Sequence, residues 1–524
     1  MARQRFVIDT AAVPPDRMLW NDVSRCLLCE DAPCAKACPL NLEPDRRLRA
    51  LRFVDLYGAV RDYPAACGDC GNACEQACVL GRIDRPVEIR RIMEKTKAVA
   101  DTVTDLPEDH ELPDLSAEIC GVKLENPFLL SSSVVASNYE MCAKALSMGW
   151  AGVCFKTICT FDQHEASPRF SVLRQGASEF FGFKNIEQLS DHAVRENMEI
   201  FRRLKQDFPQ KVIVASIMGK DEKEWEDLAR ECQEAGADVI ECNFSCPNLE
   251  DGALGVTIGQ SEELIERFTR AARRGCTVPL LAKMTPNITD MVPMAEAARR
   301  GGADGIAAIN TIKSITGVNK ETLVSEPSVH GRSALGGYSG KAVKPIALRF
   351  ISELGTSPEL AGMHLSGMGG IETWQDALEF ILLGAGSLQI TTAVMQYGYR
   401  IIEDLLEGLD GYMRERNIKD IGSLIGQALD SIVVLDEVER DTVLFPVFHS
   451  ESCIGCGRCY LSCYDGGHQA IRFDPATRKP QLDGSKCVGC HLCRLVCPTG
   501  SIRTAKSRVS RKAIHKADFE EPVL

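Results

Sequence analysis

Two dense groups of cysteines, one near each end of the chain, limit what this sequence can fold into more than any other feature. Of the 24 cysteines, eight lie between Cys26 and Cys78 and eight between Cys453 and Cys497. Disulfide frameworks of this density belong to small exported domains, whereas this chain has 524 residues and no apolar signal-peptide core at its start. The pattern therefore predicts metal-binding thiolates in a cytoplasmic protein.

Length and charge narrow the class further. A chain of 524 residues exceeds one ordinary core and predicts about three domains. The net charge of −13 argues against nucleic-acid binding, and no apolar run reaches the roughly 18 residues of a membrane helix. The cysteine groups suggest an N-terminal domain at residues 1–110, a central domain at 116–435 and a C-terminal domain at 436–524.

The C-terminal cysteines follow C-x2-C-x2-C-x3-C twice, which is the spacing of bacterial two-cluster ferredoxins. In that spacing the fourth cysteine of each run binds the other cluster. One [4Fe–4S] cluster is therefore expected on Cys453, Cys456, Cys459 and Cys497, and another on Cys463, Cys487, Cys490 and Cys493. Structural zinc is the alternative, but zinc ribbons use paired knuckles rather than such triplets.

The N-terminal cysteines have a different spacing that also suits two [4Fe–4S] clusters, with zinc again the alternative. They are Cys26, Cys29, Cys34 and Cys38, then Cys67, Cys70, Cys74 and Cys78. The domain is expected to be helical, with a helix from Asp45 to Arg61 between the two groups.

Two stretches of this segment, CLLCEDAPC at 26–34 and CEQACVLG at 74–81, resemble the N-terminal cluster domain of dihydropyrimidine dehydrogenases and of the glutamate synthase small subunit. The resemblance implies one cluster on Cys26, Cys29, Cys34 and Cys78, and three ligands of a second on Cys38, Cys70 and Cys74. In those families a Gln or Glu supplies the last ligand, but Met93 occupies the matching place here. The fourth ligand is open between Cys67 and Glu94.

The central region alternates short apolar runs with helix-length spacers. The runs are Phe128–Ser131, Gly152–Thr157, Val212–Ile217, Val239–Asn243, Leu280–Met284, Gly305–Asn310, Met363–Ser366 and Ser387–Thr391. Eight apolar strands in about 310 residues predict an α/β fold, a closed (β/α)8 TIM barrel, rather than an open sheet.

Polar residues stand where these strands end, which is where barrel enzymes build their sites. Gly369-Gly370 and the hydroxyls of Thr391 and Thr392 could cradle a phosphate. Lys156 and Lys283 each need an electron-rich partner, such as a reduced flavin or a core carboxylate. No Gly-x-Gly-x-x-Gly follows a strand, so nicotinamide chemistry is assigned to a partner.

One cysteine of the central region stands out. Cys246 lies in Asn-Phe-Ser-Cys-Pro-Asn at the end of the fourth strand, on a loop where a thiol can transfer a proton. Other single cysteines, such as Cys142 and Cys232, are interpreted as packing.

This motif, together with KMTPN at 283–287, GIAAINT at 305–311 and SGKAVKP at 339–345, resembles the pyrimidine-reducing flavin barrels. The resemblance covers about residues 116 to 520 and points to the catalytic subunits of bacterial NAD-dependent dihydropyrimidine dehydrogenases. It implies FMN on Ser132, Lys156, Thr157, Lys283, Gly340, Met368, Gly369, Gly370, Thr391 and Thr392. It implies a pyrimidine on Asn185, Glu187, Asn243, Phe244, Ser245, Asn310 and Thr311, with Cys246 catalytic.

The function expected is reversible reduction of uracil or thymine to the 5,6-dihydropyrimidine. Hydride would come from FMN, the proton from Cys246, and electrons through four [4Fe–4S] clusters. The electron donor would be an FAD- and NAD(P)-binding subunit or a ferredoxin, and an oligomer is expected. A dihydroorotate dehydrogenase is one alternative, although Glu187 should repel the carboxylate of orotate. An electron-transfer subunit is another.

Overall fold

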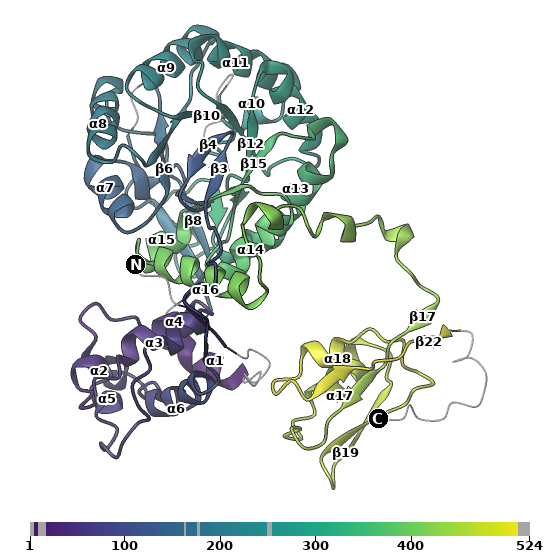
Figure 1. The fold of residues 1–524 in the computed structure, drawn as a ribbon. Coiled ribbons are helices and arrows are strands. Elements are labelled where there is room, and N and C mark those ends of the chain that lie inside the picture. Colours follow the sequence, from purple (N-terminus) through teal and green to yellow (C-terminus); the bar gives the residue numbers. More distant parts are fainter. Residues whose placement is uncertain (1–4, 9–16, 162–163, 176–178, 249–253, 512–524) are drawn as a thin grey trace.

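The computed structural model describes residues 5–8, 17–161, 164–175, 179–248 and 254–511. Figure 1 shows three bodies in chain order: a helical N-terminal domain, a barrel, and a small C-terminal domain that an extended segment joins to the barrel. Among the described residues, no helix combines the length and the apolar character needed to span a membrane.

The central body is a closed barrel of eight parallel strands. In chain order they are β5 (Phe128–Leu130), β6 (Gly152–Ile158), β9 (Val212–Ile217), β10 (Val239–Asn243), β11 (Leu280–Lys283), β12 (Gly305–Ala308), β15 (His364–Met368) and β16 (Ser387–Ile390). These are the eight strands that the sequence predicts, and pairing of Leu388 with Phe128 closes the ring. The predicted barrel is confirmed. Its strands are apolar throughout because both faces are covered.

Helices between the strands surround the barrel (Figure 1). They are α7 (Tyr139–Ser147), α8 (Val194–Asp207), α9 (Glu222–Glu234), α11 (Glu262–Gly275), α12 (Val292–Gly301), α13 (Lys344–Thr356), α14 (Trp374–Leu382) and α16 (Ile401–Glu415). Side chains at Asn138, Asp221, Ser261 and Thr373 cap four of them by accepting backbone N–H groups. Between the outer helices and their strands, α10 (Val256–Gly259) and α15 (Thr392–Tyr397) are short helices near strand ends.

Two hairpin-like insertions that the strand pattern did not predict form a second, antiparallel sheet. Its strands lie in the order β13 (Ile312–Ser314), β14 (Gly336–Ser339), β8 (Glu179–Asn185) and β7 (Phe170–Gln175). Since β7 and β8 follow barrel strand β6, and β13 and β14 follow β12, this sheet stands at the carboxyl ends of the barrel strands. A small hairpin, β3 (Ala117–Ile119) and β4 (Val122–Leu124), packs at the opposite end of the barrel on Leu129 and Leu281.

The N-terminal domain is built from short helices. They are α1 (Arg17–Ser24), α2 (Pro33–Lys36), α3 (Pro44–Arg52), α4 (Leu56–Val60), α5 (Ala73–Gln76) and α6 (Ile89–Ala100), with β1 (Phe6–Val7) paired to β2 (Thr104–Asp105). The prediction of one helix from Asp45 to Arg61 was wrong. The chain breaks between α3 and α4 because Val54 has a left-handed φ of 61° and Asp55 caps the next helix by accepting from Gly58 N at 2.9 Å.

This domain packs directly on the barrel. Arg61 Nη1 donates to both carboxylate oxygens of Glu407 on α16, at 2.9 Å each. Trp374 Nε1 donates to Val54 O at 2.9 Å, and the Phe53 ring lies 5.0 Å from that of Tyr397 at the end of α15. The two bodies therefore share buried apolar and charged contacts rather than a loose tether.

The C-terminal domain has two similar halves, each a short helix beside a two-stranded ladder. Its elements are β17 (Thr442–Val443), β18 (Pro446–Phe448), α17 (Arg458–Gly466), β19 (Ile471–Asp474), β20 (Lys479–Leu482), α18 (Leu492–Leu495), β21 (Ile502–Thr504) and β22 (Val509–Ser510). Strand β18 pairs with β21, and β19 with β20. The segment that leads to this domain exposes several apolar side chains, among them Val434 and Leu435.

Candidate active site and cluster sites

A cavity opens at the carboxyl ends of the barrel strands, below the small antiparallel sheet. It encloses about 1110 Å³ of space including its opening to solvent. All the residues predicted to bind FMN line it: Ser132, Lys156, Thr157, Lys283, Gly340, Met368, Gly369, Gly370, Thr391 and Thr392. So do Cys246 and most of the predicted pyrimidine ligands: Asn185, Glu187, Asn243, Asn310 and Thr311.

Two predicted pyrimidine ligands do not line this cavity. Phe244 is fully buried, and its ring lies 5.2 Å from that of Trp225 on α9, in the packing outside the barrel. Ser245 lies behind the cavity wall, where its hydroxyl donates to Asn243 Oδ1 and accepts from Asn310 Nδ2, each at 2.8 Å. Phe244 thus packs the loop, and Ser245 holds two asparagines in place.

Lys283 pairs with a buried carboxylate, Glu241, which was not predicted from the sequence. Its ammonium, in a residue only 3% exposed, lies 3.3 Å from Glu241 Oε1 on β10 and 3.0 Å from Ser132 Oγ. Gln389 Nε2 donates to the other oxygen of Glu241 at 3.0 Å. Glu241 is an inward-facing residue of a barrel strand, two positions before Asn243, so strand alternation could have indicated it.

Lys156 belongs to a second charged group at the cavity wall. Its Nζ lies 2.8 Å from Glu165 and 3.7 Å from Glu187, and Arg169 Nε donates to Glu187 at 3.0 Å. Burial raises the pKa of Glu187, while Lys156 lowers it. The charge of Glu187 is therefore compensated by two cations within the protein.

Three asparagines that line the cavity are held by their own hydrogen bonds. Asn243 Nδ2 donates to Thr157 Oγ1 at 2.9 Å, Asn310 Nδ2 to Ser245 Oγ at 2.8 Å, and Asn185 Nδ2 to Gly337 O at 3.2 Å. Each amide nitrogen has two N–H groups, and within the described residues each uses one of them. Three amide N–H donors therefore remain for a ligand.

Asn248 lies two residues after Cys246 and was not predicted from the sequence to belong to the site. Its Nδ2 donates to Glu187 O at 2.5 Å, while its buried Oδ1 has no partner among the described residues. A buried acceptor without a donor costs stability unless a ligand supplies the hydrogen bond. Cys246 itself is 7% exposed and reaches the same cavity.

The other end of the cavity is built of glycines and hydroxyls. Gly340, Gly369 and Gly370 have φ values of 87°, 122° and 79°. A Cβ on Gly370 would stand 2.9 Å from Gly340 O and from Lys344 N, so only glycine fits there. Ser339 and Thr392 are linked through their hydroxyls at 2.9 Å, and Ser133 and Thr391 at 3.1 Å. This end offers backbone and hydroxyl donors to an anion.

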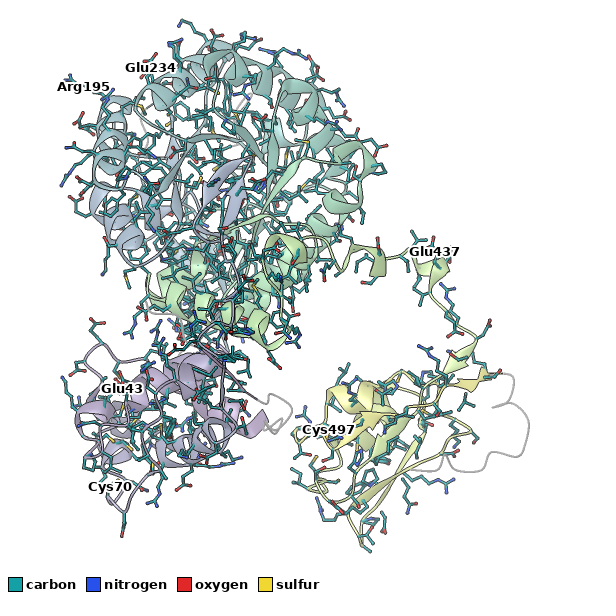
Figure 2. The ribbon with its side chains drawn as sticks, viewed as in Figure 1. Glu43, Cys70, Arg195, Glu234, Glu437 and Cys497 are labelled. Atoms are coloured by element: carbon teal, nitrogen blue, oxygen red, sulfur yellow. The ribbon has the colours of Figure 1, made fainter. Side chains whose placement is uncertain are left out.

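The sixteen predicted cluster cysteines line four cavities in the two flanking domains. In the C-terminal domain one cavity is lined by Cys453, Cys456, Cys459 and Cys497, and the other by Cys463, Cys487, Cys490 and Cys493. In the N-terminal domain the sets are Cys26, Cys29, Cys34 and Cys78, and then Cys38, Cys67, Cys70 and Cys74. Figure 2 places Cys70 in the N-terminal body and Cys497 in the C-terminal body. The fourth cysteine of each C-terminal run crosses over as the spacing predicts.

Two kinds of metal site use four cysteines. A tetrahedral zinc site needs four sulfurs about 2.3 Å from one point, whereas a cubane binds each cysteine to a different iron. Across the part of the chain that the structure describes, no three His, Cys, Asp or Glu side chains come close enough to bind a single ion.

Comparison with protein families divides the chain into three matched parts. Residues 114–413 match the dihydroorotate dehydrogenase family, and residues 447–504 match a 4Fe-4S dicluster domain. Residues 8–106 match domain II of dihydropyrimidine dehydrogenase, described as a 4Fe-4S cluster domain.

Individual relatives are similar to large parts of the chain. The NAD-dependent dihydropyrimidine dehydrogenase subunit PreA of Escherichia coli K12 is 53% identical over 410 residues, 78% of this chain and 98% of that one. The chloroplastic NADP(+) dihydropyrimidine dehydrogenase of Arabidopsis thaliana is 38% identical over 330 residues, 60% of this chain and 77% of that protein. The catalytic subunit of dihydroorotate dehydrogenase B (NAD(+)) from Pyrococcus abyssi is 35% identical over 316 residues, 60% of this chain and 99% of that one.

A solved structure, ligand-free DHODH from Eimeria tenella, has a similar fold over part of this chain. It superposes with a TM-score of 0.50 at 21% identity, over 61% of this chain and 93% of that one.

Proposed function

The chain belongs to the dihydroorotate dehydrogenase family, among the PreA-type subunits of NAD-dependent dihydropyrimidine dehydrogenase, and we propose that it interconverts uracil or thymine and the 5,6-dihydropyrimidine. The observation that carries the proposal is the cavity at the strand ends. There the thiol of Cys246 shares one space with three amide donors and two buried lysines.

The family implies FMN, and the residues of this cavity fit it. Gly340, Gly369 and Gly370 line the cavity beside the hydroxyls of Thr391 and Thr392, so backbone N–H groups and hydroxyls there can bind a phosphate. Toward the barrel axis, Lys283 and the buried Oε1 of Gln389, which has no hydrogen-bond partner among the described residues, can meet the polar edge of a flavin ring. When bound there, FMN supplies the hydride chemistry, which is the cofactor's own.

The polar groups around Cys246 match the edge of a pyrimidine. Uracil presents two carbonyl acceptors, and Asn185, Asn243 and Asn310 keep N–H donors for them. Uracil also presents ring N–H groups, and Asn248 Oδ1, which no described residue hydrogen-bonds, can accept one. A ring without these groups would leave buried amides unpaired, so the site should discriminate against it.

Cys246 is the group we assign to proton transfer. Its thiol would protonate C5 of the pyrimidine while C6 receives the hydride, so the C5=C6 double bond becomes a single bond and Cys246 becomes a thiolate. Solvent can return the proton because the residue keeps some exposure. A positioned general acid of this kind contributes about 10²- to 10⁴-fold in rate.

The flanking domains suit the delivery of single electrons. We propose four [4Fe–4S] clusters, one in each cysteine-lined cavity. PreA-type proteins are subunits, so this chain works with a partner. We propose an FAD- and NAD(P)-binding subunit or a ferredoxin for that role, in the cytoplasm, where thiols and clusters stay reduced.

Dihydroorotate is the rival substrate. Repulsion between Glu187 and the carboxylate of dihydroorotate is weakened in the structure, because Arg169 and Lys156 compensate the charge of Glu187. The other alternative is that the protein only relays electrons. That role would not explain the amide N–H donors that line the cavity around Cys246.

One experiment separates these readings. The anaerobic, oxidised protein is mixed with dihydrouracil or with dihydroorotate, and flavin and cluster absorbance is recorded. Bleaching by dihydrouracil supports the proposal, bleaching by dihydroorotate alone transfers it to the biosynthetic reaction, and no bleaching by either supports the relay. Cys246→Ala should keep FMN and clusters but slow bleaching by about 10²- to 10⁴-fold. Cys142→Ala, a buried cysteine of α7, is the matched control.

A further inference from the structure

The second cluster site of the N-terminal domain has four candidate thiolate ligands. Its cavity is lined by Cys38, Cys67, Cys70, Cys74 and Met93, and otherwise by Pro39, Leu40, Leu42, Pro44 and Gly68. We propose that Cys67 is the fourth ligand, so that this [4Fe–4S] cluster is held by cysteine alone. The inference rests on the proposed function only in assuming that the domain holds two clusters.

The four cysteines come to this cavity from separate turns of the chain. Cys38 follows α2, Cys74 lies in α5, and Cys67 and Cys70 belong to the loop before α5. Cys38, Cys67 and Cys74 pack together against the buried apolar core of the domain, and Leu42 N donates to Cys38 Sγ at 3.4 Å. An N–H donated to a ligand sulfur is the kind of contact that orients a cluster thiolate.

Glu94 does not compete for the same position. Its side chain is 54% exposed and ion-paired with Arg90 Nε at 2.9 Å, one turn earlier on α6. Met93, the preceding residue, faces the cavity instead, and successive residues of a helix point about 100° apart. Turning Glu94 inward would break its ion pair and displace Met93, which is only 2% exposed. Met93 offers a neutral thioether rather than a thiolate.

Charge favours a cation at this place. Four cysteines share one small cavity whose other walls are mostly apolar, and a cysteine that binds iron does so as an anionic thiolate. Several anionic groups can share a small apolar cavity only when a cation compensates them. Four thiolates also add one negative charge compared with a set of three thiolates and a neutral ligand. Net charge is one of the terms that set cluster potentials, so this cluster should be harder to reduce than a carboxamide-ligated one.

The test uses the full-length protein purified without oxygen. Iron per chain is counted, and electron paramagnetic resonance spectra are recorded on oxidised and dithionite-reduced samples. Wild-type protein should contain about sixteen irons in four cubanes. Cys67→Ala should lose at least one iron, and an oxidised-state [3Fe–4S] signal should appear while the reduced signal of the second N-terminal cluster is lost. Glu94→Gln is the matched control and should retain the wild-type iron and spectra.

A double variant guards against simple misfolding. Met93 lines the cavity, so Cys67→Ala/Met93→Gln can offer a carboxamide oxygen in place of the thiolate. Recovery of the fourth iron, with a reduction potential above that of wild type, would support the assignment. Retention of all iron in Cys67→Ala, or loss of iron in Glu94→Gln, would overturn it. A wild-type count near twelve would mean that the second N-terminal cluster itself is absent, and the proposed number of clusters would fail with it.

Discussion

The buried pair of Lys283 and Glu241 offers a quantitative test of how the barrel prepares its cavity. Glu241→Gln keeps the size and one acceptor of the side chain but removes its charge. Lys283, 3% exposed and 3.3 Å from the carboxylate, would then be a buried cation whose remaining hydrogen-bond partners among the described residues are the hydroxyls of Ser131 and Ser132. The substitution therefore isolates the electrostatic part of the contact.

The expected cost follows from the distance. At an effective dielectric constant of 20, two unit charges 3.3 Å apart attract with about 5 kcal/mol. Breaking a buried pair by removing one partner costs about 3–5 kcal/mol in measured cases. We therefore expect the FMN-free protein to lose about 3–5 kcal/mol in the free energy of barrel unfolding at neutral pH.

The reduction potential of bound FMN provides a second measurement, and it should rise where the stability falls. Without Glu241, the charge of Lys283 should stabilise the anionic reduced flavin, so the reduction potential should rise. Urea unfolding of the FMN-free protein, followed by the fluorescence of the barrel residues Trp150 and Trp225, measures the loss of stability. A potentiometric titration of the holoprotein measures the reduction potential. Glu263→Gln, at an exposed position of α11, controls for the change itself. Equal stability and equal potential in Glu241→Gln and wild type would refute the reasoning.

Two more predictions concern the phosphate end and the base of the barrel. Gly370→Ala should weaken FMN retention at least tenfold, because the φ of Gly370 is 79° and the added Cβ would stand 2.9 Å from Gly340 O. Fluorescence of released flavin measures this loss. Gly362→Ala is the control: Gly362 has a φ of 82° and open space around it, so this variant should retain FMN as wild type does. Burial lowers the pKa of His364 to about 4 from its ordinary 6.5, so the unfolded state takes up a proton first as pH falls, and stability should drop by about 1.5 kcal/mol between pH 6.5 and 5. His364→Gln, which can still bond Ser387, should lose less over that range in urea unfolding; equal losses would contradict the assignment.

The sequence was sufficient wherever the signal is local. The spacing of the C-terminal cysteines predicts which four share a cavity, because short connections limit where each thiolate can reach. The apolar runs predict the eight strands of the barrel, because a strand buried on both faces must be apolar along its length. The strand-end residues then converge on one cavity, since parallel strands in a closed barrel all end at the same face.

The rest depended on contacts between residues far apart in the chain. No periodic pattern in the sequence predicted the antiparallel sheet in which β8 pairs with β14, because these strands are separated along the chain by about half the barrel. No sequence motif identified Asn248 or Glu241 as site residues. Only their burial and their hydrogen-bond partners in the structure show that they belong to the site. The choice between Cys67 and Glu94 is likewise set by direction: both stand near the cluster site in sequence terms, but packing of α6 turns Met93 inward and leaves Glu94 in solvent. Ligand spacing and strand pattern are properties of short segments, whereas the direction of a side chain is decided by everything that packs around it.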